Sequence, residues 1–533
     1  MKISKYPVYG VLALAALGAV SCTDDLNVEP DDPNTIMKIK DAEMLYSEFA
    51  SVYNDLVTGE GVAVSDGGAG SWTRCHFNLQ ELPTDECFIS YKWNDPGYEV
   101  LNFATWNNNN EWIYAAYTRE NHLAKIASGF IKDMNDYGEA LIPDEAERKS
   151  MIAEARVLRA FANYTLIDLF GKGPWITEDS PTGVAPETYD RKQMFEGTVA
   201  DLKACLEDLK PAAQQVYGRL SKEAGYMLLA KLYLNAEVYV GTPMYQECAD
   251  ALKHVCETGI SLAPTYKYLF CADNDRYVGK GEIIWGVPSQ QNQTETYGST
   301  TYLTAAAWIE SADPAELHRL NANGNWSGLR LRPEVSRSTK GDPRRLIYEG
   351  TYQEDIPDLS AYDATSCGYM LVKFTNTLST DYDNTQLIAE NEAKVAAGGN
   401  AVWNNGTDIS NTDYPLFRLA DAYLMAAECQ ARGANVAIDG TDGYGLMNRV
   451  RARVGLTSIA VPTLSDILSE RQKELYMEGH RRTDLIRFGL FTGGNYRWSW
   501  KGGQYEGIAI ADYRALYPIP YQYEQTVGQN TGY

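Results

Sequence analysis

Positive charge is scarce in this chain of 533 residues. Its 47 lysines and arginines face 71 aspartates and glutamates, which leaves a formal net charge of −24. Because phosphate backbones repel so acidic a chain, we expect no nucleic acid among its partners. The rest of the composition is globular, with 44% hydrophobic and 22% charged residues, which excludes a wholly disordered chain.

The common catalytic and metal-binding motifs are also missing. The sequence has no GxxxxGK[ST] loop, no HExxH pair, no GxSxG elbow and only five histidines. Glu470, Glu474 and Glu478 are spaced by four residues, which predicts one helix face. The basic residues interleaved with them, such as Arg471 and Arg481, favour an ion-pair network there over catalysis.

Cysteines are few and carry no metal-binding spacing. No CxxC and no Cys/His cluster occurs among the nine cysteines. Cys248 and Cys256 lie eight residues apart on a predicted helix, which is about 12 Å by helical rise and too far for a disulfide. The eight cysteines after Cys22 therefore mainly predict small buried side chains, and the sequence leaves their pairing open.

Long hydrophobic runs are missing except for a short one near the N-terminus. Residues 11–20 (VLALAALGAV) follow two lysines and are too short to span a bilayer. Small residues then lead to Cys22, as in a lipobox, where the cysteine carries the lipid. We expect residues 1–21 to be a lipoprotein signal peptide and 22–40 an acidic tether. An ordinary cleaved signal peptide is the alternative.

Helical periodicity is clear in the middle and towards the end of the chain. One apolar stripe runs from Met151 to Leu169 and another from Leu416 to Ala427. A helix from Ser221 ends at Gly241, and a second one, over 245–258, stops at Gly259.

These two consecutive helices resemble a tetratricopeptide-type hairpin. A comparable pair is predicted over 415–431 and 443–454. The remaining long stretches are rich in Gly, Asn, Asp and Pro and hold short strand-like pieces, such as Ile283–Val287 and Met370–Phe374.

We therefore predict a mainly α fold, in which a scaffold of tetratricopeptide-like hairpins supports a large loop-rich region with minor β structure. A single domain would cover 41–533. Its helical scaffold would come from about 41–57, 111–258 and 413–490, and its loop-rich regions from about 58–110 and 259–412.

Four stretches of the sequence resemble the markers of a known family. They are EARVLRAF at 154–161 with the following DLFGKGP, FRLADAYL and AE within 417–428, the Glu- and Arg-rich run 470–489, and YPIP with the final residues in 517–533. Together with the lipobox, these markers resemble the SusD/RagB family of outer-membrane lipoproteins that bind glycans. The resemblance extends from residue 22 to residue 533.

The likeness is strongest to the starch-binding founder of that family. Shared stretches include ELPTDEC at 81–87, ADND at 272–275 and WKGG at 500–503. The resemblance implies glycan contacts at Asp66, Arg74, Tyr91, Trp93, Asn94, Tyr297 and Trp326. The founder has two tryptophans soon after its Asp-Glu-Cys, where this chain has Ile89 and Tyr91 and then Trp93.

Sugar chemistry explains why such residues recur. A pyranose offers an apolar face to an aromatic ring, while Asp, Asn and Arg bind its hydroxyls. Trp326 lies in the turn-like NGNWSG, where a large ring is hard to bury. The alternatives are that each ring plugs a loop onto the scaffold and that Arg74 and Asp66 form an ion pair that holds a loop.

The resemblance also suggests a structural calcium ion near Asp275 and Asp413. The ADND stretch departs from the EF-hand pattern, and a solvated turn is the alternative. No cofactor is expected to be required.

The function implied is non-catalytic, cell-surface binding of an oligosaccharide or polysaccharide, with an α-glucan such as starch favoured. The protein would be held at the outer membrane by a palmitate-type lipid anchor on Cys22, facing the cell exterior. It would deliver glycan to a SusC-like TonB-dependent transporter for polysaccharide utilisation. The alternatives are an outer-surface glycoside hydrolase with an unrecognised carboxylate pair, and a structural lid of the transporter complex.

Overall fold

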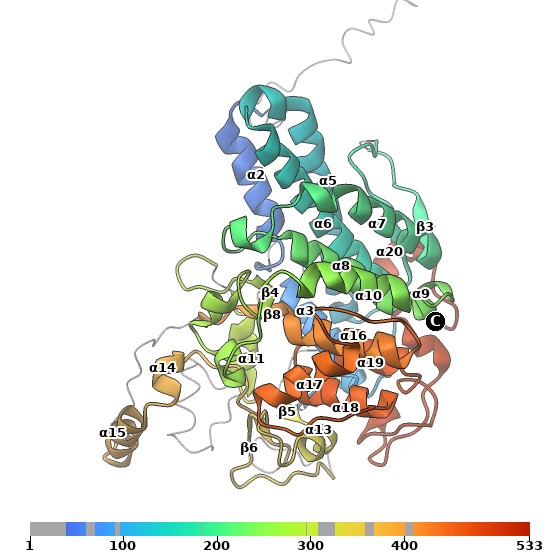
Figure 1. The fold of residues 1–533 in the computed structure, drawn as a ribbon. Helices are drawn as coiled ribbons and strands as arrows, with labels where there is room; N and C mark the ends of the chain where they lie inside the picture. The colour runs from blue at the N-terminus through green and yellow to red at the C-terminus, as the bar shows by residue number, and fades with distance from the viewer. Residues whose placement is uncertain are drawn as a thin grey trace, which may run out of the picture.

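The computed structural model describes residues 39–59, 70–90, 96–181, 183–294, 296–307, 326–357, 367–399 and 409–533. It confirms the predicted fold class, because helices dominate and strands occur only as short pairs (Figure 1). None of the helices in these ranges is both long and apolar enough to cross a membrane.

Long helices of the N-terminal half form the upper part of the molecule in Figure 1. Helix α5 (Glu111–Leu141) packs along α6 (Glu145–Leu169), with α2 (Ala42–Asn54) and α7 (Arg191–Cys205) beside them. Four of their N-caps are Asp or Asn side chains that accept hydrogen bonds from the first turn.

The first predicted hairpin is present. Helices α8 (Lys222–Leu234) and α9 (Ala236–Val240) are followed by α10 (Tyr245–Cys256), which packs against α8. Gly241 adopts a left-handed φ of 72° directly after α9, as a helix-ending glycine should.

The second hairpin is present with one correction. It consists of α16 (Leu419–Ala431) and α17 (Gly443–Arg453), which pack together. Residues 415–418, predicted as helix, belong instead to the strand β8 (Tyr414–Arg418). All five strand residues are buried, and a short apolar run does not by itself distinguish a buried strand from a helix.

Strands occur in four antiparallel pairs within the described ranges. Of the two predicted pieces, Ile283–Val287 is β4 as expected, whereas the strand in the other covers only Met370–Leu371, β7. The pairs are β1 (Cys87–Ile89) with β5 (Leu329–Leu331), β2 (Lys172–Pro174) with β3 (Thr188–Asp190), β4 with β8, and β6 (Ile347–Tyr348) with β7.

The regions predicted as loops contain additional helices. Helix α3 (Trp72–Glu81) has six polar residues among its ten, yet nine of the ten are buried, so its polar composition indicated a loop rather than a core helix. The others are α4 (Tyr98–Asn102), α11 (Thr300–Ala307), α13 (Pro333–Ser338), α14 (Ser379–Tyr382) and α15 (Thr385–Ala396).

The last third of the chain supplies α18 (Leu464–Leu475), α19 (Arg481–Arg487) and α20 (Tyr521–Val527). The eight cysteines in the described ranges are all buried free thiols, which confirms their prediction as small core side chains.

A buried ion-pair network joins the middle of the chain to α18. Arg418 bonds the carboxylates of Glu282 and Glu478, each at 2.7 Å, and that of Glu474 at 2.9 Å. The predicted glutamates are therefore ion-paired, but not with the basic residues interleaved with them: Arg471 pairs with Asp421 and Asp484, and Arg481 with Asp85. Glu478 lies beyond the end of α18 rather than on its face, and it pairs with Lys373, distant in sequence, at 2.7 Å.

Candidate functional site

Two aromatic side chains meet at the surface beside helix α11. The ring centroids of Tyr297 and Trp326 lie 6.1 Å apart, and their planes are inclined by 56°. Tyr297 is 54% exposed, and Trp326 is half-buried. The structure therefore brings together two of the predicted sugar contacts, which are 29 positions apart in the sequence.

Helix α11 explains how this pair is held. Tyr297 lies just before the first turn of the helix, and the backbone N–H of Trp326 donates to the carbonyl of Ala305 at 3.0 Å. All eight side chains of α11 are buried, and the hydroxyl of Tyr302 donates to Asn78 on α3 at 2.9 Å. The two rings therefore lie next to a helix that is itself packed into the scaffold.

Arg74 occupies a different environment from this ring pair. Its side chain is 1% exposed, and its guanidinium lies over the rings of Trp112, at 5.0 Å, and Tyr302, at 4.6 Å. It also donates to the hydroxyl of Tyr98 at 2.8 Å. This burial favours a role in packing beneath the surface; the alternative ion pair with Asp66 involves a residue outside the described ranges. Direct contact with sugar stays a prediction.

The other four predicted glycan contacts lie outside the described residues: Asp66, Tyr91, Trp93 and Asn94. The described residue directly before the last three, Ser90, has a defined position. The backbone N–H of Ser90 donates to the carbonyl of Gly328 at 2.8 Å, two residues after Trp326.

Asp275 and Asp413, the predicted calcium ligands, line one open cavity. Asp413 is 1% exposed, and its two carboxylate oxygens accept from the Ser289 N–H at 3.0 Å and the Tyr217 hydroxyl at 2.6 Å. Burial, with a smaller contribution from the charge of Asp275, raises the pKa of Asp413 to about 7.

The donor set of this cavity suits calcium in type. Calcium prefers oxygen ligands from carboxylates, amides and backbone carbonyls, and Asn411 and Gln290 line the cavity together with the two carboxylates. Within the described ranges, no three His, Cys, Asp or Glu side chains converge as a metal cluster. A calcium ion would therefore depend on amide and carbonyl oxygens for much of its shell.

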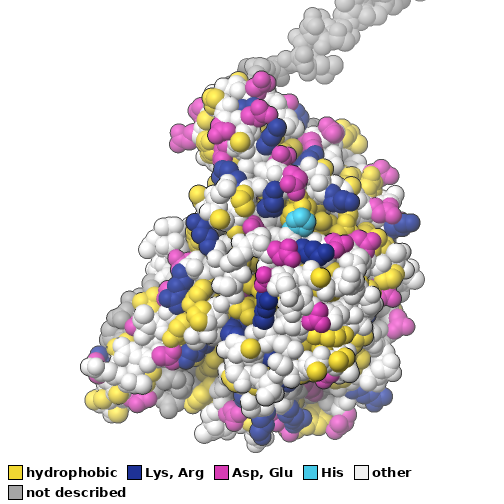
Figure 2. Space-filling model, in the orientation of Figure 1, with side chains coloured by type: hydrophobic (Ala, Val, Ile, Leu, Met, Phe, Trp, Pro, Cys, Tyr) yellow, Lys and Arg dark blue, Asp and Glu magenta, His cyan; other side chains and the backbone are white. Residues whose placement is uncertain are grey.

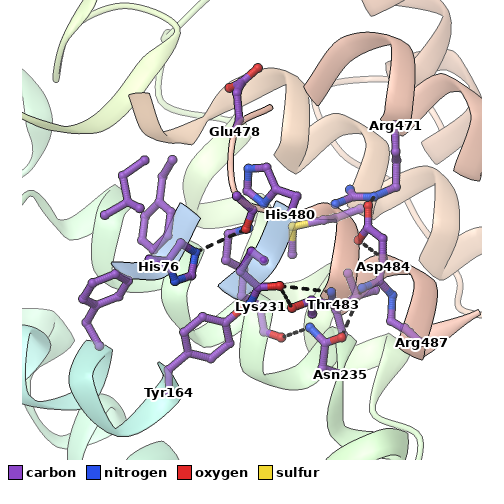
Figure 3. Close-up of a pocket in the computed structure, with 17 residues that line it drawn as sticks. His76, Tyr164, Lys231, Asn235, Arg471, Glu478, His480, Thr483, Asp484 and Arg487 are labelled. Atoms are coloured by element: carbon purple, nitrogen blue, oxygen red, sulfur yellow. Dashed lines mark hydrogen bonds and ion pairs between the residues drawn. The ribbon is translucent and has the colours of Figure 1, made fainter. Parts of the chain in front are cut away.

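Another cavity lies inside the scaffold and is lined by titratable side chains (Figure 3). Its volume is about 30 Å³, room for one or two water molecules and far too small for a sugar. His76 points into it, 3.2 Å from the carbonyl oxygen of Gly479, and burial lowers its pKa to about 4. The cavity belongs to the packed interior beneath the Glu- and Arg-rich segment 470–489.

Sequence reasoning missed Tyr217, whose ring is 51% exposed beside Asp413. It stands between the scaffold helices α7 and α8, in a stretch that the periodicity assigned to the frame. One signal was present, because Gly218, the next residue, marks a turn, and it adopts a left-handed φ of 82°.

The fold and the sequence both match known proteins. The profile of the SusD family matches residues 281–533. The structure superposes on a laminarin-binding SusD-like protein with a TM-score of 0.66 and 22% identity, covering 93% of this chain and 100% of the other. Residues 281–533 therefore match the SusD family, and the chain as a whole has the fold of SusD-like proteins.

Particular relatives are similar over nearly the whole length. The starch-binding protein SusD of Bacteroides thetaiotaomicron is 28% identical, with 98% of each chain covered. Surface glycan-binding protein A from the same species, solved with laminarihexaose, has a TM-score of 0.67 and 19% identity, covering 92% of this chain and 100% of its own.

Proposed function

We propose that this protein binds a glucan at the cell surface, through sugar rings that stack on Tyr297 and Trp326. The observation that carries the proposal is the exposed, angled ring pair held by α11. Rigid aromatic side chains lose little conformational entropy on binding, so such a surface suits reversible capture of a polymer.

The angle between the two rings favours a curved glucan. Consecutive sugars of a flat ribbon present nearly parallel faces, which cannot both stack on planes inclined by 56°. A chain that coils turns its faces from one residue to the next. Starch and laminarin both coil, and both appear in the names of relatives. We favour an α-glucan because the starch-binding relative aligns over 98% of this chain.

Calorimetry on the protein without residues 1–22 tests this proposal. We expect heat of binding with maltoheptaose and β-cyclodextrin and none with the flat chain cellohexaose. Laminarihexaose serves as the coiled β-linked comparison. A folded sample that binds no member of this panel would overturn the proposal.

Trp326→Ala should abolish binding while the melting temperature stays near that of the wild type. Tyr46→Ala is the matched control, because Tyr46 is 45% exposed on α2. If Trp326→Ala loses binding and fold together, the ring is a plug that holds its loop rather than a sugar contact.

Binding without bond cleavage is part of the proposal. The carboxylates that the sequence singles out, Glu470, Glu474 and Glu478, are at most 2% exposed and ion-paired, so they support a structural role. Incubation with starch followed by assay of reducing ends tests this. Release of reducing ends that persists in a highly purified sample would favour the glycoside hydrolase.

We further propose that lipid on Cys22 anchors the protein to the outer membrane, facing outward, and that a SusC-like TonB-dependent transporter receives the glycan. The lipobox and the match of residues 281–533 to the SusD family support both parts. Cys22→Ala should release the protein from cells, and the transporter should co-purify with the anchored wild type. Co-purification that needs no glycan-binding residue, with no glycan bound by either form, would favour the structural lid.

A calcium ion at Asp275 and Asp413 is the remaining proposal. A ligand that binds only the folded state raises stability with the logarithm of its concentration once this exceeds Kd, so calcium should raise the melting temperature of the wild type. The increase should disappear in Asp275→Asn. Equal melting temperatures in calcium and in EDTA would reject the site.

A further inference from the structure

An open cavity of about 430 Å³ lies beside the exposed ring of Tyr217. That volume falls in the range of small-molecule sites, about 300–1,000 Å³, and is far larger than a single cation needs. Polar side chains line the rest of it: Asp275, Gln290, Gln291, Asn292 and Asn411. An exposed aromatic ring surrounded by amides and carboxylates is the chemistry that recognises a pyranose.

The ring of Tyr217 is fixed before any ligand arrives. Its hydroxyl donates to Asp413 at 2.6 Å, and that carboxylate also accepts from the backbone of Ser289 at 3.0 Å. The backbone N–H of Asp413 in turn donates to the side-chain oxygen of Asn274 at 2.9 Å. A ring that is already ordered pays little further entropy on stacking against a sugar.

The amide rim is ordered as well. The side-chain oxygen of Asn411 accepts from the backbone N–H of Gln291 at 2.8 Å, which sets the orientation of that amide. Asn411 and Gln291 belong to two segments, 409–413 and 288–294, which meet here. The cavity therefore has walls from distant parts of the chain in a defined arrangement.

This cavity and the Tyr297–Trp326 pair lie along the same short helix. The backbone N–H of Ser410 donates to the hydroxyl of Thr301 in the first turn of α11, at 3.0 Å. Trp326 is bonded to Ala305, which is about 6 Å further along the helix axis by helical rise. Residues 289–292, which line the cavity, lie only five to eight positions before Tyr297 in the sequence.

We propose that the Tyr217 cavity is a second carbohydrate subsite, which holds a further part of a glucan already bound at Tyr297 and Trp326. This inference rests on the proposed function of that ring pair. A long oligosaccharide would reach both places, whereas a trisaccharide on the ring pair would not.

The test compares the binding of maltotriose and maltoheptaose by calorimetry, with calcium kept in constant excess. Laminaritriose and laminarihexaose are run in parallel. Tyr217→Ala should weaken binding of the longer glucan about five- to tenfold and leave that of the trisaccharide on the ring pair unchanged. Tyr217→Phe is the matched control, because it keeps the ring and loses the hydroxyl; it should lose clearly less affinity for the longer glucan than Tyr217→Ala does.

Two results would overturn the inference. One is an unchanged affinity of Tyr217→Ala for the longer glucans. The other is an equal loss in Tyr217→Phe, which would assign the effect to the bond with Asp413 rather than to stacking. Gln290→Ala, a surface change at the same cavity, should also weaken only the longer glucan, and it covers the case in which Tyr217→Ala fails to fold.

Trp326→Ala measured alongside separates this inference from the proposed function. If Trp326→Ala abolishes binding and Tyr217→Ala changes nothing, only the second subsite fails. If Trp326→Ala leaves binding intact, the proposed function of the ring pair fails instead.

Discussion

The ion-paired interior and the aromatic surface use opposite chemistry. Arg418 pairs with three carboxylates, and Lys373 pairs with one of them; all five side chains are 1% exposed or less. The rings of Tyr297 and Trp326 are neutral, the first exposed and the second half-buried, and they lie beside the short helix α11. Figure 2 shows acidic and basic side chains interspersed over the visible face rather than gathered by sign.

The buried ion pairs therefore stabilise the fold, whereas the surface rings are available to bind a ligand. Buried charges with several partners fix one arrangement, because removing any partner leaves an unpaired charge in the interior. Exposed rings contribute little to the free energy of unfolding, so their removal should weaken ligand binding and leave stability nearly unchanged. The following predictions test that difference, the first three from the largest expected effect on stability to the smallest.

Replacing Arg418 should have the largest effect. Arg418→Met leaves the carboxylates of Glu282, Glu474 and Glu478 short of their shared cation, at a cost of about 3–5 kcal/mol in the free energy of unfolding. Chemical denaturation measures it. Arg449→Met is the control, because its pair with Asp439 is exposed and worth about 1 kcal/mol or less. A similar loss in the free energy of unfolding for both variants would contradict the distinction between buried and exposed ion pairs.

Packing of the second hairpin gives the next largest effect. A Cβ atom at Gly443, the first residue of α17, would overlap the backbone carbonyl of Ala426 on α16, which cannot rotate away. Gly443→Ala should therefore lower the free energy of unfolding by about 1–3 kcal/mol.

Its control is Gly129→Ala on α5, where a Cβ atom meets nothing within 4 Å. That change should raise stability by about 0.5–1 kcal/mol, because alanine is the better helix former. Thermal denaturation of both variants shows the sign of each change. A destabilised Gly129→Ala would contradict the argument.

At the surface, Tyr297→Ala should weaken glucan binding at least tenfold, which corresponds to about 1.4 kcal/mol of binding free energy. Its free energy of unfolding should stay within about 0.5 kcal/mol of the wild type, because the side chain is 54% exposed. Tyr137→Ala, 38% exposed on α5, should leave affinity unchanged. A large loss of stability in Tyr297→Ala would show that this ring stabilises the fold, as the scaffold residues do.

The last prediction concerns the pH dependence of stability. Burial, together with the charge of Asp133, raises the pKa of Glu48 to about 7. The folded chain therefore keeps this proton while the unfolded chain loses it near pH 4.5, and the contribution to stability falls as pH rises from about 4.5 to 7. Glu48→Gln should gain stability over the wild type at pH 7 and much less at pH 5.

Melting temperatures at the two pH values measure this effect, with Glu43→Gln on the same helix as the baseline. A difference between Glu48→Gln and the wild type that is the same at both pH values would reject the raised pKa.

The sequence predicted local features of the scaffold well and distant pairings poorly. The α8–α10 hairpin followed from apolar spacing and from Gly241, which are local signals. Helix α3 was missed because its many polar residues indicated a loop, and part of β8 was taken for helix because Leu416 continues the spacing of the stripe that runs on to Ala427. In the network, Lys373 and Arg418 pair with Glu478 across more than 50 positions, which no local spacing reveals.

The candidate site depended on resemblance rather than pattern. Tyr297 and Trp326 each lie in a turn-like stretch, and nothing between them in the sequence indicates that they meet. Arg74 shows the limit of this transfer, because a position can match while its side chain is buried. Tyr217 was assigned to the frame because it stands among predicted helices.

The pairing of β4 with β8 has a consequence for how such proteins diversify. Ile283 lies opposite Arg418, so everything between them, Tyr297 and Trp326 included, is one long excursion that leaves and re-enters the frame at neighbouring strands. Closing a loop costs only about 0.6 kcal/mol more for each doubling of its length. Insertions, deletions and substitutions in the exposed parts of this excursion can thus accumulate during evolution and retune the ligand, whereas Lys373, which also lies within it, is tied to the frame through Glu478.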